Sequence, residues 1–431
     1  MKKNVKNFAL SASAAAVLLA MAGSASAANW LMLQGTERTA QAPGTQVWGF
    51  IQPTYMQTKG TKLPAGPYTG QNSAFNSIAP DQNTNSSFNI MRAQVGVRGA
   101  NMPLDPKINY FFLAEFGNNG ITANGGGSAR VTDASVTFNH LPGARVRVGQ
   151  FKTPGSEESF QAIHVFDYVN FTAVTDQMVL ERYVDSAAEP SLNGPVSAFR
   201  DVGVQVFDTF NAGGLEHAYA VMLGNGNGIS RGDNDDNREL YLYWSTEKVF
   251  GGQGPRREGL KGYVWNQSGK RTIAQGEFDR KRSGVGMTYR KGADRFSAEY
   301  ITADGMIFDG TAGGAVAGAR NNANTTNATI NTHPEGKAMG YYLDYGRLLT
   351  KKWEVGVRYD VLERMTNNAT AERHFKTITL GTQYFFNPRT RMAFNYEMRS
   401  AEAPNLPSTA VPNQILDSMD DRISLQVTAI F

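Results

Sequence analysis

The chain of 431 residues contains no cysteine. It therefore cannot form a disulfide, a thiolate metal site, a covalent c-type haem attachment or a cysteine nucleophile. Its five histidines are scattered along the sequence, without the spacing of a metal site. The one Gly-x-Ser-x-Gly match, at 228–232, lies in a polar glycine- and asparagine-rich stretch and not at a strand-to-helix turn, as a nucleophile would require. The glycine-rich run 224–228 is not followed by a helical pattern, as a phosphate-binding loop would be. We accordingly predict no cofactor, no metal and no catalytic residue.

An excess of charge of one sign is also missing. Lysine and arginine total 42, against 38 aspartate and glutamate residues. Three of the lysines lie within 1–27, which holds no acidic residue, so the rest of the chain is nearly neutral. Bulk charge therefore offers no basis for binding nucleic acid, and no such partner is expected.

Long apolar runs are scarce, and the one that stands out lies at the N-terminus. Three lysines precede an alanine-rich apolar run over 8–22, which is followed by Ala25-Ser26-Ala27. A basic start, a short apolar run and small residues at the end are typical of a secretory signal peptide, predicted here over 1–27. A membrane-spanning helix would need about 20 apolar residues. We expect 28–45 to form a periplasmic N-terminal segment.

What the chain has in abundance is alternation between apolar and polar residues. In 88–100, for example, Val95 and Val97 alternate with Gln94, Gly96 and Arg98, and Met91 and Ala93 are assigned to the same apolar face as the valines. A period of two residues predicts a β-strand with one apolar face. The pattern recurs in about sixteen segments: 46–57, 88–100, 107–117, 131–139, 144–152, 201–211, 215–224, 238–246, 260–267, 281–291, 295–302, 338–347, 353–363, 374–386, 391–400 and 422–431.

The connections between these segments alternate in length. Short ones fall at 101–106, 140–143, 212–214, 292–294, 348–352 and 387–390. Long ones fall at 58–87, 118–129, 153–199, 225–237, 303–337, 364–372 and 401–421, and 247–259 is a long exception on the short side. Outer-membrane barrels have short periplasmic turns, long external loops and an even strand number. We predict an all-β, transmembrane antiparallel β-barrel over 46–431 in the bacterial outer membrane, surrounded by lipid and lipopolysaccharide.

The last segment is expected to close this barrel. Its apolar residues, Ile423, Leu425, Val427 and Ala429, would face lipid, and Arg422, Ser424, Gln426 and Thr428 would face the channel. It resembles the closing strand of outer-membrane barrels, whose terminal phenylalanine, here Phe431, is read by the barrel insertion machinery. Aromatic residues near strand ends are interpreted as a girdle at the membrane interface: Trp48, Trp244, Trp353, Tyr384, Phe386 and Phe431.

A barrel of this size is wide enough for an aqueous channel, lined by the polar face of each strand. That face carries more basic than acidic residues. The candidate anion path consists of Arg92, Arg98, Lys107, Arg145, Arg147, Arg282, Arg290, Arg358, Arg391 and Arg399. A confined basic wall favours anions, and the planar guanidinium binds oxyanions through two parallel bonds. Alternatively, these charges form cross-strand ion pairs that stiffen the barrel.

The longest connection, 153–199, is the candidate constriction loop. Its charged residues, with the last residue of the preceding strand, include Lys152, Glu157, Glu158, Asp167, Asp176, Glu181 and Arg182. If the loop folds inward, its acids face a basic wall and create a transverse field. If it stays outside, the acids lie in water.

Several segments together resemble a known family. They are FNIMRAQVGVRG at 88–99, DASV at 133–136, LPGARVRVGQFK at 141–152, LER at 180–182, RDVGVQ at 200–205, LGNGNG at 223–228 with DNDDN at 233–237, and VRYD at 357–360. This set is similar, in the same order, to the phosphate-selective porin O and P family. The resemblance implies a sixteen-stranded, homotrimeric outer-membrane porin with a basic channel and an infolded third external loop.

The predicted function is an outer-membrane porin for passive diffusion of small hydrophilic solutes, with a bias to anions such as phosphate. The alternative is a general porin, or one that prefers sugars or carboxylates, without phosphate selectivity. An outer-membrane enzyme would need a polar catalytic cluster near a loop rim, and the sequence shows none. A structural barrel with a plugged lumen is a further alternative.

Overall fold

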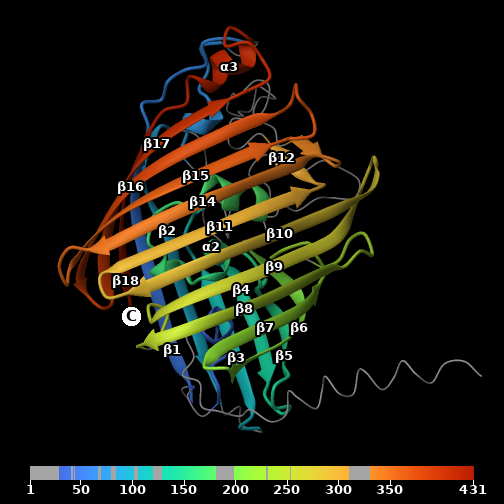
Figure 1. Cartoon of the computed structure of the whole chain (residues 1–431), viewed down its shortest axis with the longest axis vertical. Helices are drawn as coiled ribbons and strands as arrows, with labels where there is room; N and C mark the ends of the chain where they lie inside the picture. The colour runs from blue at the N-terminus through green and yellow to red at the C-terminus, as the bar shows by residue number, and fades with distance from the viewer. Residues whose placement is uncertain are drawn as a thin grey trace, which may run out of the picture.

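The computed structural model describes residues 29–39, 42, 44–66, 69–78, 84–100, 105–119, 129–180, 199–229, 232–252, 254–309 and 331–431. Sixteen strands pair in sequence order, each antiparallel to its neighbours, and β1 pairs with β18 to close a barrel. Figure 1 shows these strands tilted around a common interior. The predicted fold class and the strand number are confirmed.

The barrel strands are β1 (Gln46–Gln57), β2 (Ser86–Gly99), β3 (Ile108–Glu115), β4 (Arg130–Phe138), β5 (Arg145–Lys152), β6 (Arg200–Ala212), β7 (Leu215–Gly224), β8 (Glu239–Gly251), β9 (Glu258–Ile273), β10 (Gly276–Lys291), β11 (Asp294–Asp304), β14 (Lys337–Leu348), β15 (Trp353–Arg364), β16 (Arg373–Asn387), β17 (Thr390–Glu402) and β18 (Arg422–Ile430). The strands β12 (Ile307–Asp309) and β13 (Asn331–His333) pair as a separate two-stranded sheet.

Helical elements are short and lie in the connections. They are η2 (Trp30–Met32), η3 (Ala74–Asn76), α2 (Glu157–Phe160), η4 (Ile163–Val165), η5 (Thr175–Val179) and α3 (Val411–Leu416). Within the described ranges, no helix is long and apolar enough to cross a membrane.

The strands β8, β9 and β10 extend further than the alternation predicts. Between β9 and β10 the connection shrinks to Ala274 and Gln275, and the expected long turn at 247–259 shrinks to 252–257. The extended hairpin carries exposed ion pairs, such as Lys270 Nζ to Glu277 Oε1 at 2.5 Å. Both faces of this hairpin carry polar residues, so no apolar alternation marks where it continues.

The two faces of the closing strand lie as predicted. Ser424, Gln426 and Thr428 are buried on the inside, whereas Ile423 and Leu425 are exposed on the outside. The backbone N–H of Phe431 donates to the carbonyl of Gly49 at 2.9 Å, which joins the chain's end to β1. The outer face of the whole barrel exposes large apolar side chains of this kind, as a lipid-facing surface requires.

Two β-bulges correct the predicted faces. The pairing of β1 with β2 shifts register between Gln52 and Pro53, and Met91 is the extra residue. A bulge sets two residues against one, so Met91 and Arg92 are both buried inside, and the assignment of Met91 to the lipid face was wrong. Proline at position 53 has no N–H to give to the ladder, which favours a bulge there. The alternation in 131–139 predicts that Thr132 shares the apolar face with Ala134 and Val136, but a similar shift in β4, opposite Leu113, buries Thr132 inside.

Trp48 is also placed differently from the expectation. Four of the predicted girdle aromatics are exposed on the outside: Trp244, Trp353, Phe386 and Phe431. The Trp48 ring instead stacks on Phe111 inside the barrel, with their centroids 6.2 Å apart. The reason is parity, because Trp48 lies on the same side of β1 as the buried residues Phe50 and Gln52.

Candidate functional site

The described part of the candidate constriction loop, 153–180, lies inside the barrel. Ser156 Oγ donates to Glu299 Oε2 of β11 at 2.9 Å, and the Val169 N–H donates to Asn395 Oδ1 of β17 at 2.7 Å. Strands so far apart around the wall can be reached together only from the interior. Figure 1 shows α2 behind the front strands, in agreement with these contacts.

The acidic residues of α2 pair with basic residues of the wall. Glu157 Oε2 lies 2.6 Å from Lys261 Nζ of β9, and Glu158 Oε1 lies 3.1 Å from Arg358 NH1 of β15. Both carboxylates are buried, and a buried charge needs such a partner. The neighbouring Phe160 is also buried, so apolar packing adds to the ion pairs that hold the segment.

Asp167 lies among several arginines. Its carboxylate is 2.6 Å from Arg256 NH2, 3.4 Å from Arg295 Nε and 3.6 Å from Arg290 NH2. Arg256 comes from the 252–257 turn, which reaches into the lumen from the short-turn end. Arg256 is absent from the residues predicted for the site, although the unusual length of that turn was the available signal.

Lys152, Glu157, Glu158 and Asp167 are therefore gathered in the lumen. The Lys152 ammonium donates to the carbonyls of Ser159 at 2.8 Å and Gln161 at 2.5 Å. Asp176 lies in η5. Glu181 and Arg182 lie outside the described residues.

The chain before β1 also enters the barrel. Trp30 Nε1 donates to Glu157 Oε1 at 2.8 Å, and Asn29 Nδ2 donates to Ser245 Oγ of β8 at 3.0 Å. Trp30, Leu31 and Met32 are all buried. The expected periplasmic segment 28–45 thus has its first described residues in the lumen, where their apolar side chains are removed from water. The predicted signal peptide over 1–27 lies outside the described residues.

Three of the predicted anion-path residues form ion pairs. Arg98 NH1 lies 3.0 Å from Glu37 Oε1, while Arg290 pairs with Asp167 and Arg358 with Glu158. Lys107 lies in the turn before β3 and is exposed.

Six other predicted arginines are held by uncharged acceptors: Arg92, Arg145, Arg147, Arg282, Arg391 and Arg399. Arg147, for example, donates to Gln34 Oε1 at 3.0 Å and to the Gln34 carbonyl at 3.1 Å. Arg282 donates to the carbonyls of Met178 at 2.7 Å and Gly305 at 2.9 Å. Arg399 donates to the carbonyls of Asp420 at 2.9 Å and Phe75 at 3.0 Å.

These uncharged partners fix each guanidinium without cancelling its charge. Among the residues that the structure describes, none of the six arginines forms an ion pair with a carboxylate. A guanidinium stays protonated in proteins, so the wall keeps this positive charge. The alternative interpretation, that wall charges serve only as cross-strand ion pairs, therefore does not describe these six.

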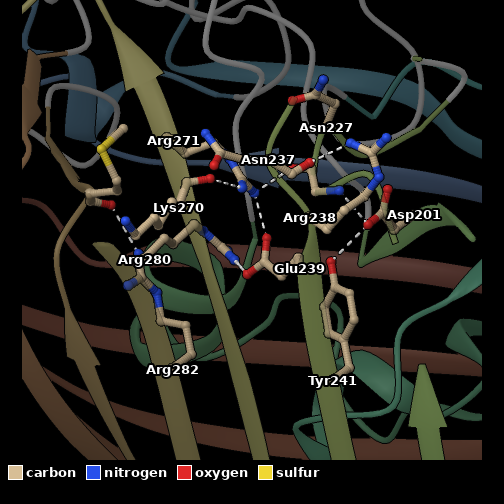
Figure 2. Close-up of polar contacts among 12 residues, drawn as sticks. Asp201, Asn227, Asn237, Arg238, Glu239, Tyr241, Lys270, Arg271, Arg280 and Arg282 are labelled. Atoms are coloured by element: carbon tan, nitrogen blue, oxygen red, sulfur yellow. Dashed lines mark hydrogen bonds and ion pairs between the residues drawn. The ribbon is translucent and has the colours of Figure 1, made fainter. Parts of the chain in front are cut away.

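A further arginine cluster lies near the loop end of the barrel (Figure 2). Glu239 of β8 accepts from Arg271 NH2 at 2.5 Å and also from Arg280, and Figure 2 shows Arg282 beside them. Tyr241 donates to Asp201 Oδ2 at 3.0 Å next to this group. Arg271 and Arg280 were missed because the predicted strands ended at 267 and resumed at 281.

A cavity of about 560 Å³ remains between the constriction segment, the N-terminal segment and the strands β1 to β6. Its charged lining includes Arg92, Arg98, Lys152 and Arg200, with Glu37 and Asp133. Its aromatic lining includes Trp30, Trp48, Phe111, Phe160, Phe171 and Phe199. Within the described ranges, no group of three or more histidine or acidic residues is arranged to hold a metal ion. This lumenal cavity is the candidate site.

No protein-family model and no curated protein matches the chain. Solved structures do match. An anion-selective porin from Comamonas acidovorans aligns with a TM-score of 0.54 and 13% identity, over 90% of this chain and 99% of that one. The outer membrane channel DcaP of Acinetobacter baumannii gives 0.53 and 11%, over 90% and 97%. Salmonella typhi OmpF, in a complex with daunomycin, gives 0.51 and 12%, over 90% and 97%.

At these identities the similarity concerns the fold, which is that of outer-membrane porins. A closed barrel with an apolar outer face satisfies all backbone groups in lipid. The protein is therefore a β-barrel of the bacterial outer membrane.

Proposed function

We propose that the protein is a passive diffusion channel for small hydrophilic solutes, with a preference for anions such as phosphate. The observation that carries this proposal is the set of six lumenal arginines held by amide, hydroxyl, thioether or carbonyl acceptors. None of them forms an ion pair with a carboxylate of the described residues, and a confined positive wall raises the local concentration of anions. Inorganic anions are the expected solutes, and a homotrimer stays a prediction from the family resemblance.

A channel without phosphate selectivity is the second candidate. The observation that favours it is the neutralisation of Lys261, Arg290 and Arg358 by acids of the constriction segment. Where a wall cation is paired with an acid, the wall presents a dipole rather than a net positive charge. Such a wall can bind sugars as well as anions.

The test is the reversal potential of the purified protein in a planar bilayer under a potassium chloride gradient. We expect the sign that indicates anion permeation. The double variant Arg92→Gln and Arg399→Gln should move the potential toward zero, because both side chains are charged and neither forms an ion pair within the described part of the chain. The control is Arg347→Gln, whose exposed guanidinium already pairs with Asp294 at 2.9 Å.

A cation-selective wild-type channel would refute the anion preference. Phosphate preference is tested by titrating phosphate against the chloride current, with sucrose at matched osmolarity as the neutral solute. Equal effects of phosphate and sucrose would favour the second candidate.

A further inference from the structure

The walls of the lumenal cavity are largely aromatic. Trp48 stacks on Phe111 with centroids 6.2 Å apart and nearly parallel ring planes, and His164 tilts against Trp48 at 5.5 Å. Phe160 and Phe171 of the constriction segment also line the cavity. Contact with such rings does not stabilise bound chloride or phosphate, because these ions have no apolar surface to bury. The aromatic wall therefore suits an apolar part of a solute, whereas the arginines suit an anionic part.

Of the cations that line this cavity, Arg92 and Lys152 are at least half-buried and form no ion pair with an acid of the described residues. Arg92 is only 4% exposed and has one hydrogen bond, to Gln52 Oε1 at 3.2 Å, and its other N–H groups contact no acceptor in the described ranges. Lys152 uses two of its three N–H donors on carbonyls. By contrast, Arg200 pairs with Asp133 at 2.8 Å and Arg98 pairs with Glu37. The cavity thus combines an aromatic wall with two cations whose N–H groups can bind an anionic group.

We propose that this cavity is a binding site for a small aromatic carboxylate, of the benzoate class. The carboxylate would accept from the guanidinium of Arg92, which can offer two parallel bonds, and from the ammonium of Lys152. The ring would lie against Trp48 and Phe111, in the offset arrangement that aromatic pairs prefer. Cavities of about 300–1,000 Å³ hold small ligands of this kind, and this one measures about 560 Å³.

This inference rests on the proposed anion channel, because the solute must first enter the barrel. In a channel the site must also release its solute, so we expect weak, reversible occupancy. The measurable consequence is a short block of the chloride current while the carboxylate occupies the cavity.

The test titrates benzoate, acetate, phosphate and benzyl alcohol against the chloride current of the full-length protein in a planar bilayer. Benzoate should block at a concentration about tenfold lower than acetate or phosphate, since the ring adds apolar burial and stacking. Benzyl alcohol, which has the ring without the charge, should not block at the benzoate concentration. This comparison uses the wild-type protein and does not depend on the folding of a variant.

Two variants separate the contributions of ring and charge. Trp48→Leu should weaken the block by benzoate about tenfold and leave the block by acetate unchanged, whereas Arg92→Gln should weaken both. The matched control is Trp244→Leu on the outer face, which should change neither.

Equal block by benzoate and acetate in the wild type would overturn the proposal, and so would a benzoate block that Trp48→Leu leaves unchanged. If the potassium chloride gradient still reports anion selectivity in that case, only the aromatic site fails. Cation selectivity would instead refute the proposed function itself.

Discussion

Removing the Trp30 side chain tests whether the N-terminal segment narrows the channel. The indole is 6% exposed and belongs to the same buried apolar cluster as Phe160 and Tyr243. Its Nε1 also donates to Glu157 Oε1 at 2.8 Å. Trp30→Ala would remove both the packing and the hydrogen bond, and would leave Glu157 with Lys261 as its remaining charged partner.

The size of the effect follows from burial. Truncating a buried tryptophan to alanine costs about 3–5 kcal/mol. At about 1.4 kcal/mol for each factor of ten, the equilibrium for seating the segment weakens by about two to three and a half orders of magnitude. The polar contacts that remain, such as Arg147 with Gln34, contribute about 1.5–3 kcal/mol each because the donor is charged. The loss at Trp30 exceeds any one of these contacts, so we expect the segment to leave the lumen more often than in the wild type.

The assay is single-channel recording of the wild type, Trp30→Ala and Trp30→Phe. The alanine variant should show a larger conductance and stronger anion selectivity, because departure of the segment uncovers Arg145 and Arg147. The phenylalanine variant keeps an aromatic ring without the N–H donor and should fall in between. Trp244→Ala on the outer face is the control. Wild-type conductance and selectivity in Trp30→Ala would show that the segment does not restrict the channel.

Three further predictions concern charged and titratable groups in the lumen. Burial, reinforced by the nearby guanidinium of Arg391, lowers the pKa of His164 to about 3; the ring is then neutral between about pH 5 and 8, and the reversal potential should not follow a histidine titration in that range. Arg257→Gln removes the shared partner of two buried glutamates, Glu216 and Glu247, and should lower the free energy of unfolding by about 3–5 kcal/mol, measured by urea denaturation in detergent. Asp167→Asn removes the acid that faces several arginines and should shift the reversal potential further toward that of chloride; an unchanged potential would contradict the assignment of Asp167 to the channel.

The sequence predicts the barrel well because the alternation of apolar and polar residues can be read within each strand alone. A strand with lipid on one side and water on the other must alternate residue by residue, so Leu425 and Gln426 reveal their faces without any knowledge of partners. A bulge breaks that rule by one residue. Met91 and Thr132 were misassigned because the register shift depends on the neighbouring strand, which the sequence of their own strand does not show.

The lumen was harder to predict because its contacts join distant parts of the chain. The basic wall and the acidic loop were both visible in the sequence, but their pairing was not. The contact between Arg256 and Asp167 depends on two connections entering the barrel from opposite ends. Trp30 begins a run of only four apolar residues, 30–33, which is too short to indicate where it is buried. Its partner Glu157 lies far along the chain.

The infolded segment gives the lumen two unlike sides. Along β9, β11 and β15 its acids complete ion pairs, as Glu157 does with Lys261 and Glu158 with Arg358. Along β2 and β5 the cations Arg92 and Lys152 donate to uncharged acceptors and, within the ranges that the structure describes, to no carboxylate. A solute at the level of this segment would therefore meet dipoles on one side and net positive charge on the other. Anions should follow the β2 and β5 side, which is also where the aromatic wall lies, so charge selection and ring contact would act on the same solute at the same place.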